Sequence, residues 1–192
     1  MKRLLLIFLC AVLMACDAGN KYSTRYPCNF VFFPSQYLTS ALTRALGNPG
    51  DFVIVQPDVQ QGVTHLLLTP NHGQWAQSDV DLVMRTAIGN ERLSYNSMGA
   101  ARGLIVGCSR FFGLKAYDLQ CPNCLIDYGS PRYPLQWNAD NDQQVVCTKC
   151  RRIYSLEGDD AFPVTGGKAD DEPLMQYRVD LIGTNERLYV HN

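Results

Sequence analysis

The sequence predicts a mainly β domain in which short strands are joined by turns and hairpins. Short runs of β-branched, aromatic and other apolar residues recur along the chain, and most of them end at a glycine, a proline or an asparagine. Only one early segment has a clear helical pattern. The 192-residue chain is long enough from about residue 26 onward to bury the core of one domain.

The first elements are expected before residue 60. A strand at residues 30–33 stops at Pro34, and a short helix opens at Thr39 or Ser40 and stops at the Gly-Asn-Pro-Gly segment 47–50. The apolar face of this helix is formed by Leu42, Ala45 and Leu46. A further strand at residues 52–55 is expected to stop at Pro57.

The rest of the chain continues the strand pattern. Residues 79–88 have weak helical spacing and are expected to form a second short helix or a turn, and residues 158–171 a polar loop. The later strands are expected at 63–69, 102–107, 114–119, 143–146 and 153–156, followed by a closing hairpin of 177–181 with 187–190.

Four cysteines in two identical CxxC pairs are the strongest functional signal. Cys121 and Cys124 form the first pair, and Cys147 and Cys150 form the second after twenty-two intervening residues. This spacing is typical of a tetrahedral thiolate site for a metal ion. Two ordinary disulfides are the alternative, but a CxxC disulfide closes a tight ring, whereas two CxxC turns fit one ion without strain.

The four thiolates suit three kinds of metal centre. Zinc is favoured, because four cysteines on two CxxC turns are a common structural zinc arrangement with no open coordination position. A single rubredoxin-like iron and an all-cysteine [2Fe-2S] cluster remain alternatives. Lys149, inside the second pair, would offset part of the thiolate charge.

The N-terminus has the pattern of an export signal. Lys2 and Arg3 precede an apolar run at residues 4–14, which is too short for a permanent membrane-spanning helix. The run ends in Leu-Met-Ala-Cys, which resembles the lipobox of bacterial lipoproteins. That resemblance implies a signal peptide at 1–15 and lipidation of Cys16, hence an anchor in a membrane of the bacterial cell envelope, facing away from the cytoplasm.

The mature chain would then carry a short tether and a single domain. Residues 16–25 are small and polar enough to be a tether, and residues 26–192 form the domain. Removal of Lys2 and Arg3 leaves 15 basic and 18 acidic residues. This mildly negative balance predicts no nucleic-acid partner. Asp17 resembles an inner-membrane retention signal, and the choice between inner and outer membrane stays open.

The other candidate ligands of the domain are two cysteines and three histidines. Cys28 and Cys108 lie in apolar surroundings and are expected to be buried free thiols rather than a disulfide. His65, His72 and His191 are expected to lie in loops or in solvent, not at the metal site.

Enzymatic signatures are weak. The acidic clusters 159–160 and 170–172 are expected to be solvated, and the chain has no HExxH motif, nucleophile elbow or phosphate-binding glycine loop. We therefore expect a non-enzymatic protein. The aromatic residues between the pairs are expected to pack over the site rather than to form a recognition surface; they are Tyr128, Tyr133 and Trp137.

The second half of the chain resembles the Rieske iron-sulfur domain. The resemblance runs from about Gly103 to Val190 and rests on a strand into Cys121-Pro122, the later Cys147, the aromatic Tyr154, and Pro-Leu-x-x-Tyr-x-Val at 173–179. It implies a small antiparallel β-sandwich or barrel with a metal-binding subdomain at about 119–152, formed by two CxxC loops and accompanied by one or two short helices.

The ligands differ from the Rieske pattern, in which two cysteines and two histidines hold two irons. Cys121 and Cys147 correspond to the family's cysteine ligands, while Asn123 and Cys150 stand where its histidines would be, and Arg151 replaces a glycine. The sequence thus leads to two hypotheses: a lipid-anchored, non-enzymatic domain with structural zinc, or an electron-transfer protein with a [2Fe-2S] cluster and an unidentified redox partner.

Overall fold

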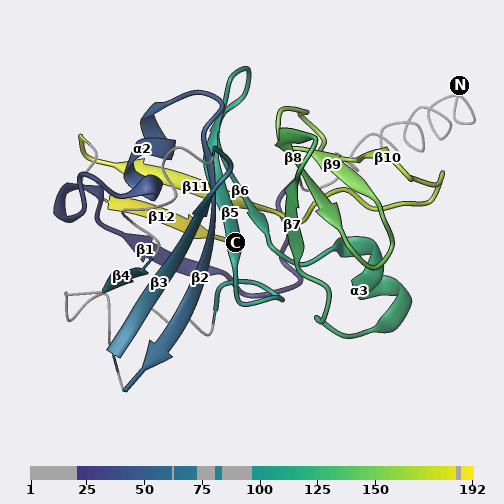
Figure 1. Ribbon diagram of the computed structural model, residues 1–192, viewed down its shortest axis with the longest axis horizontal. Coiled ribbons are helices and arrows are strands. Elements are labelled where there is room, and N and C mark those ends of the chain that lie inside the picture. Colours follow the sequence, from purple (N-terminus) through teal and green to yellow (C-terminus); the bar gives the residue numbers. More distant parts are fainter. Residues whose placement is uncertain (1–20, 62, 73–80, 84–96, 185–186) are drawn as a thin grey trace, which may run out of the picture.

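The computed structural model describes residues 21–61, 63–72, 81–83, 97–184 and 187–192. Two antiparallel sheets and two short α-helices make up this part of the chain, which confirms the mainly β prediction. The large sheet curls into a half-barrel, and a small sheet lies beside it together with the second helix (Figure 1).

The elements follow one another with short connections. The helices are η1 (Pro34–Gln36), α2 (Ala41–Gly47) and α3 (Pro122–Tyr128). The strands are β1 (Asn29–Phe32), β2 (Phe52–Gln60), β3 (Val63–Pro70), β4 (Asp81–Val83), β5 (Leu104–Ser109), β6 (Gly113–Asp118), β7 (Leu135–Asn138), β8 (Asn141–Cys147), β9 (Ile153–Ser155), β10 (Pro163–Thr165), β11 (Gln176–Ile182) and β12 (Arg187–His191).

The order of the strands shows how the metal-site region is inserted. The large sheet has the order β1-β12-β11-β6-β5-β2-β3-β4, and the small sheet has the order β10-β9-β8-β7. β6 and β11 are neighbours in the large sheet, so everything between them in sequence is one insertion. That insertion contains α3, the whole small sheet and all four CxxC cysteines.

The large sheet is covered on both faces, and the alternation of side chains along its strands explains why. In β2, Val53 and Val55 belong to the core cluster under α2, whereas Phe52 and Ile54 belong to the cluster under the small sheet. In β5, Leu104 and Val106 belong to the cluster under α2, whereas Ile105 belongs to the cluster under the small sheet. A central strand with two apolar faces needs a layer on each side, which α2 and the insertion supply.

Hydrogen bonds join the small sheet to the large one. The indole N–H of Trp137 donates to the Thr69 carbonyl at 3.0 Å, and the amide of Gln143 donates to the Gly50 carbonyl at 2.8 Å. The insertion is therefore fixed against the half-barrel through polar contacts as well as through the shared core.

Helix α2 confirms the expected early helix. Its N-cap is Ser40, whose hydroxyl accepts a hydrogen bond from the backbone N–H of Thr43 at 3.1 Å. Its buried residues are Ala41, Leu42, Ala45 and Leu46. The strand pairs expected at residues 102–119 and 177–190 are also confirmed, as β5 with β6 and β11 with β12.

The expected stop at Pro57 is wrong, because β2 continues to Gln60. β2 pairs with β5 only from Phe52 to Val55, while its pairing with β3 runs on to Gln60. Pro57 thus lies where β2 has a neighbour on one side only. Proline lacks a backbone N–H and is tolerated where the ladder does not need that donor.

Two further expectations change. Asp81–Val83 forms the edge strand β4 and not a helix or turn, because it pairs with His65–Leu67 of β3. The remainder of the expected segment 79–88 lies outside the described residues. The polar loop expected at 158–171 contains the short strand β10, which pairs with β9.

The description of the N-terminal part begins at residue 21, within the expected tether. The expected signal peptide and Cys16 lie outside the described residues. Within the tether expected at 16–25, Tyr22 forms a β-bridge with Gln176, and the N–H of Ser23 donates to the Gln176 carbonyl at 2.7 Å. Among the described segments, no helix has the length and apolar character needed to cross a membrane.

Candidate metal centre

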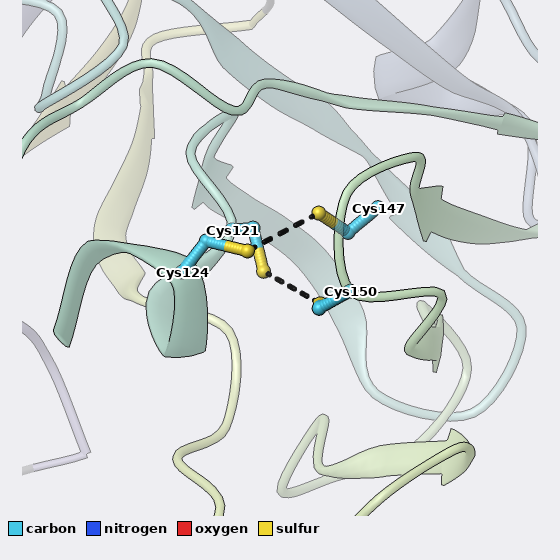
Figure 2. A group of neighbouring side chains, drawn as sticks. All are labelled: Cys121, Cys124, Cys147 and Cys150. Carbon is cyan, nitrogen blue, oxygen red and sulfur yellow. Dashed lines mark hydrogen bonds between the residues drawn. The ribbon is translucent and has the colours of Figure 1, made fainter. Parts of the chain in front are cut away.

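The four cysteines of the two CxxC pairs come together at one point between α3 and the small sheet. Their four Sγ atoms all lie within 4.8 Å of one another. The sulfurs of Cys121 and Cys150 are 3.7 Å apart, and those of Cys124 and Cys147 are 3.6 Å apart (Figure 2). A tetrahedral ion with metal–sulfur bonds of about 2.3 Å requires sulfurs about 3.8 Å apart. The arrangement therefore could hold one metal ion.

The sulfur separations also bear on the disulfide alternative. A disulfide requires an S–S distance of about 2.05 Å. All six described cysteines are free thiols, including the four of the cluster. The cluster thus has the spacing of ligands around a shared centre and not that of two covalent bridges.

The first pair is positioned by the start of helix α3, not by a loop as expected. Cys121 occupies the N-cap position and Pro122 the first helical position, where a missing N–H costs nothing. Cys124 then lies in the first helical turn, which brings its sulfur back toward that of Cys121. The helix ends at Gly129 with φ of 64°, a left-handed conformation that glycine adopts without strain.

The second pair lies in the turn between β8 and β9, as expected. The N–H of Arg151 donates to the Cys147 carbonyl at 2.9 Å, and the N–H of Cys147 donates to the Arg152 carbonyl at 3.0 Å. Arg151 closes the turn with φ of 64°. Arginine adopts here a left-handed conformation that favours glycine.

The thiols of the cluster differ in pKa. The neighbouring Cys121 thiol and the backbone N–H groups of Cys150 and Lys149 lower the pKa of Cys147 below its ordinary value. The neighbouring Cys147 sulfur and burial raise the pKa of Cys121, and burial raises the pKa of Cys124. Four thiolates this close need a cation among them, since each repels the next.

A hydrogen-bond chain supports the first pair from beneath. The hydroxyl of Tyr154, on β9, lies 3.6 Å from the Cys121 sulfur and accepts a hydrogen bond from the Asn123 side-chain amide at 3.0 Å. Asn123 also binds both backbone groups of Glu172, at 3.0 and 2.9 Å. Asn123 thus orients Tyr154 and the segment before β11.

A buried ion pair supports the second pair. Arg152 binds Asp171 with two nearly parallel hydrogen bonds of 2.7 and 2.6 Å, and both residues are buried. These bonds and a hydrogen bond to the Cys150 sulfur raise the pKa of Arg152. Asp171 was expected to be solvated, and that expectation is wrong because its partner lies nineteen residues away in sequence.

Aromatic side chains cover the site only in part. Tyr133 and Trp137 are partly buried and pack against the core that contains the cysteines, as expected, whereas Tyr128 is 53% exposed. The Lys149 ammonium lies 5.3 Å from the ring centre of Tyr128 and 5.9 Å from that of Tyr133. Lys149 is therefore held beside the second pair by two rings.

The remaining cysteines stay apart from the cluster. Cys28 is a buried free thiol, and burial raises its pKa to about 12. Cys108 is also free but only partly buried. Among the described residues, the group that could share a metal ion contains only the four CxxC cysteines.

The histidines of the chain make other contacts. The Nδ1 atom of His72 lies 2.7 Å from a carboxylate oxygen of Asp142, and the Nε2 atom of His191 lies 2.8 Å from one of Asp180. His65 lies in β3, opposite Asp58 of β2.

The chain was compared with known protein families, curated proteins and solved structures. No known family, no curated protein and no solved structure matches this chain.

Proposed function

We propose that this chain is a lipid-anchored protein of the bacterial cell envelope whose β domain carries a structural zinc ion on four cysteines. The observation that supports the ion is the meeting of four sulfurs within 4.8 Å of one another. The thiolates come from two segments that no continuous secondary structure joins, the start of α3 and the turn between β8 and β9.

The short distances between the pairs support one ion rather than a two-iron cluster. In an all-cysteine [2Fe-2S] cluster each iron binds two cysteines, and bridging sulfides separate the irons. The two cysteine pairs must then lie farther apart than around a single ion. Here each cysteine of the first pair lies 3.6 to 3.7 Å from one of the second.

The surroundings support a structural role. Cys121, Cys124 and Cys147 are fully buried, and four protein ligands leave a zinc ion no open position for substrate or water. The ion would connect α3 to the small sheet. Structural zinc sites contribute about 10–16 kcal/mol of apparent binding free energy, which is also folding free energy.

A Rieske-like architecture is part of the proposal. Both cysteine pairs lie in one insertion between neighbouring strands of a larger antiparallel sheet, and their sulfurs lie within 4.8 Å of one another. The aromatic residue expected after the second pair, Tyr154, contacts the sulfur of Cys121. The replacement of histidines by Asn123 and Cys150 suits a metal centre that has changed from the family's mixed ligand set to four thiolates.

Electron transfer is the second candidate, and the partial exposure of Cys150 favours it. A single rubredoxin-like iron has the same tetrahedral sulfur geometry as zinc. Metal analysis and absorption of anaerobically purified protein separate the two functions. We expect one zinc ion per chain and no visible absorption. Iron with charge-transfer bands in the visible range would replace the structural role with a redox role.

The lipid anchor is tested independently of the metal. We expect Cys16→Ser to abolish incorporation of labelled fatty acid and to release the protein from membranes, because Cys16 is the cysteine in the lipobox context. Metal content should not change in this variant. Label that persists in Cys16→Ser would overturn the anchor and leave the metal site standing.

A further inference from the structure

The turn between β5 and β6 exposes two adjacent phenylalanines. Phe111 is 76% exposed and Phe112 is 48% exposed, and their ring centres lie 6.5 Å apart. The β5–β6 hairpin extends beyond the neighbouring strands at the top of Figure 1. Two adjacent exposed phenylalanines on a projecting turn are unusual, because large apolar side chains normally pack into the core.

The exposure does not come from a loosely held loop. The hydroxyl of Ser109 accepts hydrogen bonds from the N–H groups of Phe111 and Phe112, each at 3.3 Å. A carboxylate oxygen of Glu157 accepts from the Ser109 hydroxyl at 2.7 Å and from the N–H of Arg110 at 2.9 Å. Three successive amides of the turn are therefore satisfied within the protein, as an apolar environment requires.

The charged residues of the turn are drawn back from its tip. The Arg110 guanidinium lies against Gly50, where a Cβ atom would come within 2.7 Å of Arg110 Nε. The Lys115 ammonium lies 4.6 Å from the ring centre of Phe112 and donates to the Gly158 carbonyl. Both cations thus contact other parts of the domain, while the two rings are exposed.

The chain enters the domain close to this hairpin. Lys21 forms an ion pair with Asp159, next to the Gly158 carbonyl that Lys115 binds. Tyr22 is fixed by its bridge to Gln176. If the lipid is on Cys16, four residues separate it from Lys21, and the five Cα-to-Cα steps between them span at most about 18 Å. The lipid would therefore hold this end of the domain close to the bilayer.

We propose that the β5–β6 turn, with Phe111 and Phe112 at its tip, inserts into the interfacial layer of the membrane that carries the lipid anchor. The proposal rests on the proposed lipidation of Cys16. Aromatic rings with satisfied backbone groups suit the boundary between headgroups and acyl chains. The charges around the hairpin are of both signs, so we expect contact with zwitterionic lipid; they include Lys21, Arg110, Lys115, Asp51, Glu157, Asp159 and Asp160.

The test places a fluorophore at the tip of the full lipidated protein. Phe111→Trp and the control Leu38→Trp are each reconstituted into phosphatidylcholine vesicles, with and without lipid brominated along the acyl chain. Leu38 is 72% exposed but lies in the loop before α2, so it is matched in exposure to Phe111. Wild-type protein gives the emission of Trp75 and Trp137 to be subtracted.

We expect a blue shift and a loss of emission with brominated lipid for Phe111→Trp, and neither change for Leu38→Trp. Equal quenching of the two variants would overturn the proposal, and so would a blue shift of Phe111→Trp in Cys16→Ser protein without lipid, which would indicate contact with a second copy. Flotation of wild-type protein with the vesicles is measured first. A protein that does not float overturns the anchor, and the insertion proposal with it, whereas floating protein with an unquenched tip overturns the insertion alone.

Discussion

Replacing Tyr154 with phenylalanine removes a single oxygen atom next to the four-cysteine cluster. Tyr154 is fully buried, and its hydroxyl lies 3.6 Å from the Cys121 sulfur. The aromatic ring of the variant fills the same space, so no cavity forms. Asn123 keeps its hydrogen bond to the Glu172 carbonyl at 3.0 Å. The variant therefore removes the contact of the hydroxyl with the Cys121 sulfur together with the hydrogen bond that the hydroxyl accepts from Asn123.

Two magnitudes for the Tyr154→Phe variant agree. A hydrogen bond to a charged group contributes about 1.5–3 kcal/mol. Loss of a group that orients a metal ligand lowers metal affinity about 10- to 100-fold, which corresponds to about 1.4–2.8 kcal/mol. We expect the zinc dissociation constant of Tyr154→Phe, measured by competition with a chromophoric chelator, to rise by about 10- to 100-fold.

Tyr177→Phe is the matched control for this measurement. Tyr177 is also fully buried, and its hydroxyl donates to a carboxylate oxygen of Asp118 at 2.8 Å, away from the four cysteines. Its loss should lower the free energy of unfolding by about 1.5–3 kcal/mol and leave zinc affinity unchanged. Equal zinc affinity in Tyr154→Phe and wild type would refute the reasoning, and so would an equal fall in both variants.

Three further outcomes are expected. Cys124→Ser should lose most of its metal and become protease-sensitive first within residues 119–152, whereas Cys108→Ser should keep its metal, since Cys108 lies outside the cluster. Arg151→Gly should raise the free energy of unfolding by about 0.5–1 kcal/mol, because relief of the left-handed strain exceeds the entropy cost of glycine; a lower melting temperature would contradict this. Burial lowers the pKa of Lys115, so the unfolded chain keeps the Lys115 proton to a higher pH than the folded protein does. In denaturant titrations, the free energy of unfolding of the wild type should therefore rise relative to that of Lys115→Met as the pH approaches the ordinary lysine pKa of 10.5. Parallel curves for the two proteins would contradict this.

The parts of the fold predictable from sequence were those encoded by local patterns. Ser40 and the apolar face after it identified α2, and alternation identified the strands of the large sheet. Helix α3 was missed because seven residues are too few to show a helical period. Its signals were Pro122 at the first position and Gly129 after the last. The end of β2 was wrongly predicted at Pro57, because the sequence does not show on which side a strand has a hydrogen-bonded neighbour.

The same distinction holds for the candidate site. The spacing of the cysteines was enough to group them, since each CxxC pair is local. The groups that support them were not predicted: the pairing of Arg152 with Asp171 and that of Asn123 with Glu172 span 19 and 49 residues. Such contacts depend on how the insertion folds back on itself, which no local pattern specifies.

Limited proteolysis of the wild-type protein tests the shared metal ion most directly. One sample receives a strong chelator alone and another a thiol reductant alone. If one ion joins the four thiolates, the chelator should open residues 119–152 to cleavage while the strands between Phe30 and Pro70 resist longer, and the reductant should change nothing. Protection that survives the chelator but disappears with the reductant would contradict the metal site and indicate two disulfides in its place.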